Sequence, residues 1–269
     1  MLVVVSPAKR LDWSEQPFAT TEPQFTAEAS RLAGHMRQLS LGNLRALMGL
    51  SDDLARLNRD RFRAFVREPE VEATRPAVYG FAGDTYLGFD AGSLDDDARS
   101  RAQSHMRILS GLYGILRPMD AIQPYRLEMG SRLKTRRGTN LYDFWGQTIS
   151  KALNEAAEEI GSDTLVNCAS QEYFGAVDLQ ALKLNVVTPV FMEVKTGEPK
   201  ILSFFAKKAR GSMARFIVEN RVTTLDGLRD FDWGGYRFVA DESDNTRLVF
   251  HREASAHAAW RDSDSIGTV

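Results

Sequence analysis

The chain has 269 residues, a formal net charge of -2 and 43% hydrophobic residues, which suffices for one large domain or two closely packed ones. The single cysteine, Cys168, excludes an internal disulfide framework and a cysteine-rich metal cluster. The first ten residues lack the apolar run of a signal peptide, and no later window approaches the roughly 20 apolar residues of a membrane span. We therefore expect a cytoplasmic protein without membrane contact.

The first part of the chain predicts a buried strand followed by helices. Residues 2–5, LVVV, are short, apolar and mostly β-branched, and they predict a strand that ends in a loop carrying Lys9. Residues 26–65 place their apolar side chains at helical spacing. Residues 75–90 predict two short strands joined by a Gly-Asp turn. The aspartates at 95–97 suit the first turn of a helix, where carboxylates oppose the positive end of the helix dipole, so we interpret them as structural.

The later part of the chain alternates helices and strands. The elements expected there are, in order, an apolar loop at 109–130, a helix at 140–161, strands at 164–170 and 184–194, a strand at 200–206 that leads into a basic helix, and a hairpin at 236–252. This alternation predicts an α/β fold, a single mixed-sheet globule with flanking helices that covers residues 1–253. Residues 254–269 are predicted to form a mobile tail.

Charge is segregated along the sequence. Residues 56–67, 126–137 and 204–221 each contain five basic residues and one acidic residue, although the whole chain has a net charge of -2. The remainder is therefore strongly acidic. We predict that the basic segments gather around one cleft that binds DNA, while the acidic remainder keeps the protein soluble and repels DNA from other faces.

Residues 47–55, LMGLSDDLA, have the spacing of the hairpin in a helix-hairpin-helix element. Gly49 would allow a tight turn that presents backbone N–H groups to a phosphate at the start of the next helix. The arginines that follow would strengthen this contact. Such hairpins usually have a second glycine where this chain has Ser51, which serves equally well as an ordinary helix N-cap. A plain helical turn is therefore the alternative.

The segment 204–221, FFAKKARGSMARFIVENR, predicts a helix with one apolar and one cationic side. The apolar side comprises Phe205, Ala209, Met213, Phe216 and Ile217, and the cationic side comprises Lys207, Lys208, Arg210 and Arg215. Gly211 indicates a helix break or a close approach of the backbone to another group, for which a phosphate is one candidate. The alternative is a solvated face whose cations pair with acids elsewhere.

Motifs for catalysis and metal binding are weak. The sequence contains no Walker loop, no G-x-G-x-x-G, no H-E-x-x-H and no G-x-S-x-G, and its four histidines lack partners at metal-ligand spacing. Cys168 lies in an apolar strand and is interpreted as a small core residue. A set of polar residues could converge at strand ends, as sites in open α/β sheets do: Lys9, Tyr125, Arg126, Glu128, Asn167, Ser170 and Glu172. The alternative function is therefore an enzyme of unknown reaction on a nucleic acid or nucleotide-like anionic substrate.

Several segments closely resemble the YaaA peroxide-stress family: VVVSPAKRLD, GDTYLGFDA, LSGLYGILRPMDAIQPYRLEMGSRL, NLYDFWG, VNCASQEYF, SFFAKKARGSMARFIVENR and GGYRF. The resemblance covers essentially residues 1–253. It implies a cytoplasmic bacterial protein of hydrogen peroxide resistance, associated with limiting unincorporated iron. It also implies an uncommon mixed α/β fold that binds DNA through a helix-hairpin-helix element and a positively charged cleft.

The resemblance places the hairpin at residues 48–55 and the cleft among basic residues of the first loop and of the basic segments. The candidate DNA-binding residues are Lys9, Gly49, Leu50, Ser51, Arg126, Arg132, Lys207, Lys208, Arg210 and Arg215. Gly49 stands where other members can have a larger residue, which brings this hairpin closer to the general DNA-binding pattern. We predict a monomer that binds duplex or distorted DNA without sequence preference and protects it from oxidative damage, without catalytic residues, cofactor or metal.

Overall fold

The computed structural model describes residues 1–195 and 197–253. Its centre is an eight-stranded mixed sheet with the order β11-β12-β9-β8-β1-β5-β6, in which β10 pairs with β9. The strands of this sheet are β1 (Leu2–Val5), β5 (Met106–Ser110), β6 (Gly114–Leu116), β8 (Thr164–Cys168), β9 (Asn185–Lys195), β10 (Glu198–Lys200), β11 (Arg237–Phe238) and β12 (Arg247–Glu253). Two small sheets pair β2 (Arg10–Leu11) with β4 (Phe81–Ala82) and β3 (Arg75–Pro76) with β7 (Ala121–Ile122). The mixed α/β class predicted from the sequence is confirmed.

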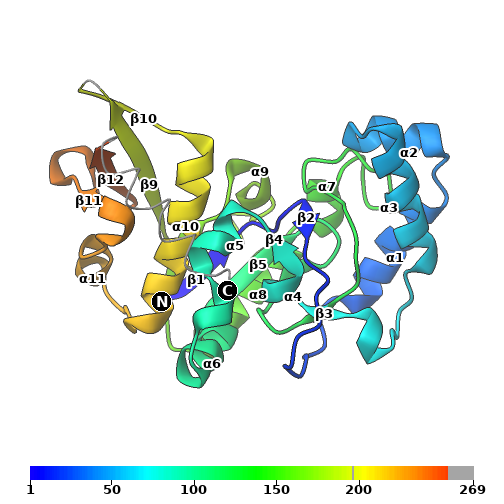
Figure 1. Ribbon diagram of the computed structural model, residues 1–269, viewed down its shortest axis with the longest axis horizontal. Helices are drawn as coiled ribbons and strands as arrows, with labels where there is room; N and C mark the ends of the chain where they lie inside the picture. Colours follow the sequence, from blue (N-terminus) through cyan, green and yellow to red (C-terminus); the bar gives the residue numbers. More distant parts are fainter. Residues whose placement is uncertain (196, 254–269) are drawn as a thin grey trace, which may run out of the picture.

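The helices form two groups (Figure 1). The α-helices are α1 (Thr26–Arg37), α2 (Leu41–Met48), α3 (Asp52–Ala64), α4 (Ala77–Gly80), α5 (Asp84–Phe89), α6 (Asp96–His105), α7 (Leu141–Trp145), α8 (Thr148–Glu159), α9 (Gln171–Phe174), α10 (Ser203–Glu219) and α11 (Leu225–Arg229). Short 3-10 helices are η1 (Val71–Ala73), η2 (Ala91–Ser93), η3 (Trp233–Gly235) and η4 (Ala240–Glu242). Helices α1, α2 and α3 lie together at one end of the molecule, and we call this group the helical lobe (Figure 1).

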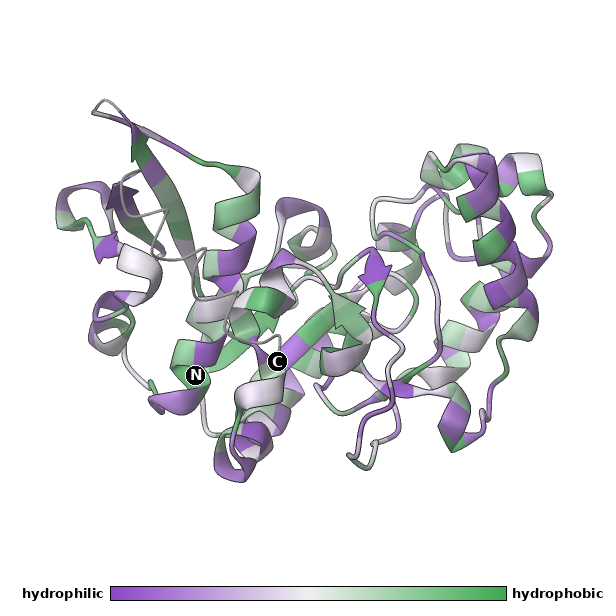
Figure 2. Cartoon of the chain, viewed as in Figure 1, coloured by the Kyte–Doolittle hydropathy of each residue, from purple (hydrophilic) through white to green (hydrophobic). Residues whose placement is uncertain are grey.

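The strand β1 lies inside the sheet, and all four of its residues are buried. It runs parallel to β5 through the pair Val3 and Met106, and parallel to β8 through the pair Val3 and Val166. A strand covered on both faces needs apolar side chains on both, which explains the run LVVV. Figure 2 shows the same concentration of hydrophobic residues on the central strands and more hydrophilic residues on the helical lobe. The carboxyl ends of β1, β5 and β8 consequently lie at one edge of the sheet.

Helix α10 packs against α5 with unusually close backbones. A Cβ atom on Gly211 would overlap the carbonyl oxygen of Thr85, and a Cβ atom on Gly88 would overlap the carbonyl oxygen of Lys208. The close approach expected at Gly211 is therefore to the backbone of α5 and not to a phosphate. The prediction of two strands in residues 75–90 is wrong, because α4 separates the two-residue strands β3 and β4 and the second predicted strand is the helix α5.

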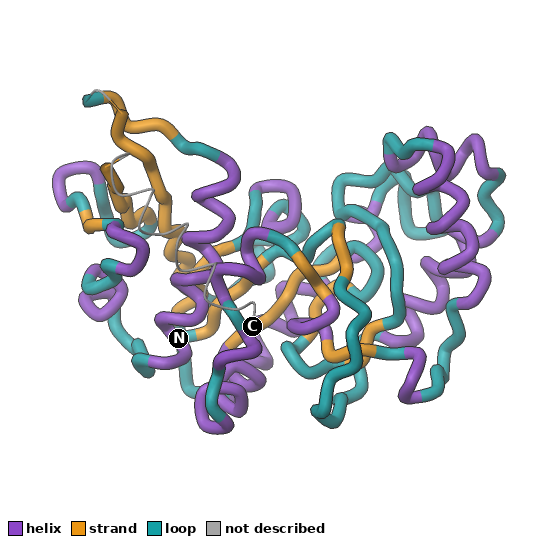
Figure 3. Tube along the Cα trace, viewed as in Figure 1, coloured by secondary structure: helices purple, strands orange, loops and turns teal. Residues whose placement is uncertain are grey.

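The strand predicted at 200–206 is wrong, because α10 already begins at Ser203, whereas two other local predictions are confirmed. Asp95 is the N-cap of α6 and accepts a hydrogen bond from the Ala98 N–H at 2.8 Å, as its proposed structural role requires. Strands β11 and β12 form the expected antiparallel hairpin, with Phe238 opposite Phe250. Figure 3 shows the loops that link the sheet to the helical lobe. The predicted tail, residues 254–269, lies outside the described residues, and the domain bounds of 1–253 stay a prediction.

Candidate functional site

The predicted hairpin residues form a helix, a tight turn and a second helix. Gly49 ends α2 in the left-handed conformation with φ of 61°, a region that favours glycine. Ser51 caps α3, and its hydroxyl accepts a hydrogen bond from the Leu54 N–H at 3.4 Å. Helices α2 and α3 are therefore joined by a tight turn, and both the helix-hairpin-helix assignment and its contact with DNA stay predictions.

The turn itself is poorly suited to bind a phosphate. The N–H of Leu50 donates to the carbonyl oxygen of Arg45 at 3.1 Å, so this donor is already used within the chain. The first turn of α3 carries Asp52 and Asp53, whose negative charges oppose a phosphate at the helix N-terminus. Asp52 also forms an ion pair of 2.5 Å with Arg45. Phosphate contacts in this lobe are consequently better supplied by basic side chains than by the turn.

Basic residues occur instead on α1 and on the loop that follows Gly130. We call this set the basic surface: Arg31, His35, Arg132, Lys134, Arg136 and Arg137. Arg132, Lys134 and Arg136 are exposed, and within residues 1–195 and 197–253 none of the three has an ion-pair partner. Their positive charges are therefore available to an external anion.

A cavity of about 550 Å³ lies in this basic surface, between α1 and the loop. It is lined by Arg31, Gly34, His35, Gln38, Thr135, Arg136, Arg137 and Phe144. The Arg137 guanidinium lies over the Phe144 ring, 4.7 Å from its centroid, and this stacking orients its donors. Glu28 approaches Arg31 at 3.2 Å and Arg137 at 3.6 Å, so one carboxylate already occupies the edge of a site suited to an anion.

The cations of α10 are mostly inside the fold. Lys207 is exposed, whereas Lys208 has 5% of its surface exposed. Burial lowers the pKa of Arg210, and Arg215 forms an ion pair with Asp90 at 3.0 Å. The exposed cationic face predicted for α10 is therefore wrong, because the sheet covers one side of this helix and α5 covers another. The DNA contacts assigned to these residues stay predictions, with Lys207 as the exposed member.

Polar residues from separate segments converge at the carboxyl edge of the sheet. The Lys9 ammonium lies 2.9 Å from Glu128 Oε2, and the Arg126 guanidinium lies 3.0 Å from Glu128 Oε1. The backbone N–H of Ser170 donates to the Ser6 hydroxyl at 2.9 Å. These residues therefore do converge in the fold, which the sequence alone could not decide. Lys9 and Arg126 both form ion pairs with the Glu128 carboxylate, so they are not two free cations.

The other polar residues expected at strand ends take structural roles nearby. Glu172 accepts the Gly130 N–H at 2.9 Å, and the Tyr125 hydroxyl lies 2.6 Å from the Ser110 hydroxyl. Asn167 accepts a backbone hydrogen bond at 3.1 Å from the residue two positions later. Ser110 was not identified from the sequence, although it stands at the end of a buried strand and could have been found by that position.

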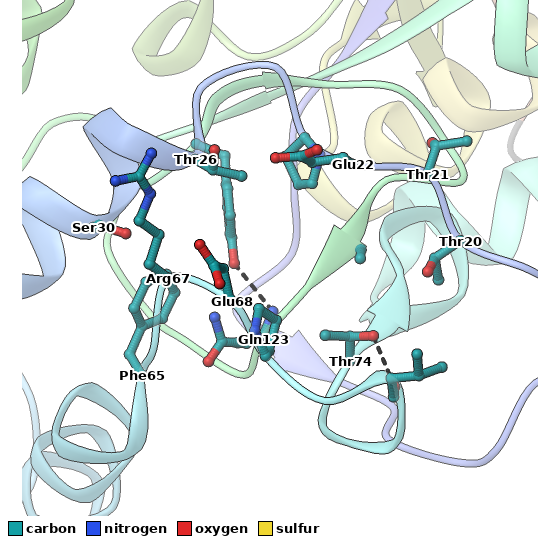
Figure 4. Close-up of a pocket in the computed structure, with 15 residues that line it drawn as sticks. Thr20, Thr21, Glu22, Thr26, Ser30, Phe65, Arg67, Glu68, Thr74 and Gln123 are labelled. Carbon is teal, nitrogen blue, oxygen red and sulfur yellow. Dashed lines mark hydrogen bonds between the residues drawn. The ribbon is translucent and has the colours of Figure 1, made fainter.

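A second cavity, of about 410 Å³, was also missed by sequence reasoning (Figure 4). It is lined by Thr20, Thr21, Glu22, Pro23, Thr26, Ser30, Phe65, Arg67, Glu68, Pro69, Val71, Thr74, Tyr113, Ala121 and Gln123. The Gln123 side-chain amide accepts a hydrogen bond from the Val66 N–H at 3.0 Å and donates one to the Val66 carbonyl oxygen at 2.7 Å. The cavity draws on segments far apart in the sequence, so no local motif could have indicated it.

Metal and thiol chemistry have little structural support. Among the residues that the structure describes, no group of three or more His, Cys, Asp or Glu is arranged to hold a metal ion. No described helix has the length and apolar character needed to cross a membrane. Cys168 is buried, and burial raises the pKa of its thiol to about 12, although the charge of Arg210 acts in the opposite direction.

Comparison with known proteins identifies the family. Residues 1–242 match the family described as peroxide stress protein YaaA. A UPF0246 protein of Ruegeria pomeroyi is 66% identical over 252 residues, which cover 94% of this chain and 98% of that protein. UPF0246 proteins of Roseobacter denitrificans and Caulobacter vibrioides are 62% and 55% identical over 254 residues, which cover 94% of this chain and 98% and 99% of those proteins. The chain therefore belongs to the YaaA family of peroxide stress proteins.

Proposed function

We propose that this peroxide stress protein binds duplex or distorted DNA through the basic surface, without sequence preference. The observation that carries the proposal is the cavity between α1 and the loop at 135–137, where arginines and a histidine face one space. Lysine and arginine contacts to phosphates hold a protein on DNA of any sequence, because every nucleotide carries the same charge. Arg137, held against Phe144, presents the planar donor set that suits a phosphate.

The charge distribution supports the same proposal. The chain has a net charge of -2, so the regions outside the basic segments are acidic and would repel DNA. The helical lobe adds two exposed arginines, Arg56 and Arg63, on the helix that follows the predicted hairpin. DNA would thus be directed to one part of the molecule.

We infer that this DNA contact contributes to peroxide defence by shielding DNA from iron-driven oxidation, together with a role in limiting unincorporated iron. We further propose that the protein acts in the cytoplasm as a monomer. The family membership supports the peroxide role, and the single cysteine, which is free, fits a reducing compartment.

The first test removes charge from the basic surface by replacing Arg132, Lys134 and Arg136 together with glutamine. All three side chains are exposed, so the fold should be retained, and glutamine keeps much of the side-chain length. We expect weaker binding to every DNA sequence, with a salt dependence shallower by about 0.9 per lost phosphate contact. Fluorescence anisotropy of labelled duplex, bubble and single-stranded DNA over a series of salt concentrations measures both quantities.

The matched control carries the same charge change on other parts of the chain, by replacing Lys151, Lys183 and Arg237 with glutamine. These side chains are also exposed. The control should retain the salt dependence of the parent. Equal DNA affinity and equal salt dependence in the parent and in the basic-surface variant would rule out the proposed interface.

A second prediction concerns hydrogen peroxide itself. Because the pKa of Cys168 is raised to about 12 and its side chain is buried, the reactive thiolate is scarce at neutral pH. We expect the folded protein to resist both thiol-specific alkylation and oxidation by hydrogen peroxide, whereas the unfolded chain should react at once. Intact mass spectrometry with and without guanidinium measures the difference. Rapid stoichiometric oxidation of Cys168 in the folded protein would contradict this prediction and would point to thiol-based peroxide chemistry.

A further inference from the structure

The carboxyl edge of the central sheet has the topology of a ligand site. Strands β5 and β8 pair with opposite sides of β1, and all three strands are parallel. The chain leaves β1 toward the segments that lead to β5, whereas it leaves β8 toward β9, which lies on the other side. Connections that leave adjacent strands in opposite directions open a crevice at the carboxyl edge, which is where open α/β sheets bind their ligands.

Hydroxyl groups gather at this edge. Ser6 follows β1, Ser110 ends β5 and Ser170 follows β8 by two residues. The hydroxyls of Ser6 and Ser170 lie 3.3 Å apart. Tyr86 donates from its hydroxyl to the Ser6 carbonyl oxygen at 3.1 Å, and burial raises the pKa of this phenol well above its usual value, so it stays a donor.

Two cations at the same edge share one carboxylate. Glu128 accepts from Arg126 Nε and Nη2 through one oxygen, at 3.1 and 3.0 Å, and binds the Lys9 ammonium through the other at 2.9 Å. The three side chains therefore carry a net charge of about +1 when ionised. The Lys9 side chain is 62% exposed, so it can turn toward an incoming anion. The carboxylate occupies the place that an anionic ligand would take.

A large cavity shares Tyr86 with this edge of the sheet. Arg10, the residue after Lys9, lines a space of about 840 Å³ together with Tyr79, Phe81, Tyr86 and Trp233. This volume lies within the range of cavities that hold cofactors and metabolites, and aromatic side chains can stack on a flat ring system. Tyr86 connects the two regions, because it is one of the residues that line the cavity and its hydroxyl donates to the Ser6 carbonyl oxygen at the sheet edge.

We propose that the carboxyl edge of β1 and β8 binds a nucleoside monophosphate, with its phosphate on Lys9 and Arg126 and its base in the cavity lined by Tyr79, Tyr86 and Trp233. Glu128 releases the two cations when the phosphate arrives and accepts a hydrogen bond from a hydroxyl of the sugar. This site is separate from the basic surface, and it assigns Lys9 and Arg126 to a small ligand instead of DNA.

Isothermal titration calorimetry of the full chain with the four ribonucleoside 5′-monophosphates, their nucleosides and inorganic phosphate tests the proposal. We expect at least one monophosphate to bind, and its nucleoside to bind about tenfold more weakly or worse, because charge-assisted contacts to the phosphate are lost. Absence of heat with all four monophosphates would overturn the proposal. Inorganic phosphate that binds as tightly as the nucleotides would overturn the assignment of the base to the aromatic cavity.

Three variants locate the site. Lys9→Gln should weaken monophosphate binding by about tenfold, whereas Lys207→Gln, which removes an exposed charge elsewhere, should not. Glu128→Gln should strengthen binding, because the amide no longer competes as an anion for Lys9 and Arg126. A purely structural role of Glu128 predicts no such gain. Unchanged affinity in Lys9→Gln, or weaker binding in a folded Glu128→Gln protein, would overturn the assignment of the phosphate.

The same proteins separate this proposal from the DNA proposal. Lys9→Gln should leave the salt dependence of DNA binding unchanged, and the variant that replaces Arg132, Lys134 and Arg136 should bind monophosphates as the parent does. A loss of nucleotide binding in that basic-surface variant would overturn the separation of the two sites.

Discussion

Replacement of Gly211 by alanine is expected to lower the free energy of unfolding by more than about 3 kcal/mol, because it inserts an atom where two helix backbones meet. The new Cβ would overlap the Thr85 carbonyl oxygen and lie 2.9 Å from the Phe89 nitrogen. Backbone atoms cannot rotate away as a side chain can, so α5 and α10 would have to separate. Separation would also disturb Gly88, which meets the Lys208 carbonyl in the same crossing. Urea denaturation followed by tryptophan fluorescence measures the change.

The control for this prediction is Gly34→Ala, in the interior of α1. A Cβ at Gly34 would have no atom within 4 Å. Because alanine favours the helical backbone, this variant should be as stable as the parent or more stable by up to about 1 kcal/mol. If Gly211→Ala unfolded at the same urea concentration as the parent, the close packing of α5 on α10 would be refuted.

The helix crossing illustrates how far sequence reasoning could go. Gly211 inside a helical pattern correctly indicated a close approach of the backbone. Its partner could not be identified, because Gly88 lies more than a hundred residues earlier and sits in a short apolar run. Such a run does not distinguish a strand from a buried helix by periodicity, and the segment around Gly88 was therefore predicted to be a strand.

The basic helix shows a different limit. Its apolar stripe was correctly predicted, since Ala209 and Met213 are fully buried. Its charge pattern predicted an exposed cationic face, yet Lys208 and much of Arg210 are enclosed because α10 is covered from more than one side. The charge pattern indicates which side of a helix is charged, but it does not indicate whether that side is exposed. Exposure depends on how many elements pack around the helix in the tertiary fold. The basic surface was partly missed for the same reason, because α1 and the loop at 132–137 meet only in the folded chain.

The cluster at the sheet edge could be predicted in part from the sequence. Residues 2–5 and 164–170 were both predicted as strands, and polar residues near their ends were identified as candidates. Whether those strand ends lie side by side depends on the order of the strands in the sheet, which cannot be predicted from either segment alone. The structure places β8 directly beside β1, and Ser6 and Ser170 come into contact as a result.

A buried charge network joins the far strands of the sheet. Arg252 on β12 donates through Nε and Nη2 to Glu193 on β9, at 2.9 and 3.0 Å, and the Tyr236 hydroxyl donates to Glu193 at 2.5 Å. The Arg252 side chain is 0% exposed and Glu193 is 3% exposed. The guanidinium also lies 4.6 Å from the ring centroids of both Phe205 and Tyr236. The two charges are therefore paired within a buried network of hydrogen bonds.

We expect Arg252→Met to lower the free energy of unfolding by about 3–5 kcal/mol, because Glu193 then loses both hydrogen bonds from the buried guanidinium. Adding Glu193→Leu and Tyr236→Phe to this variant should recover part of that loss, since the carboxylate that has lost these hydrogen bonds is then removed as well. Lys200→Met serves as the control at an exposed pair with Glu198, where the expected change is below about 1 kcal/mol. Urea denaturation of the four proteins measures these differences. If Arg252→Met alone matched the parent, Glu193 would have to be compensated by another group, and the network could not be what holds β9 to β12.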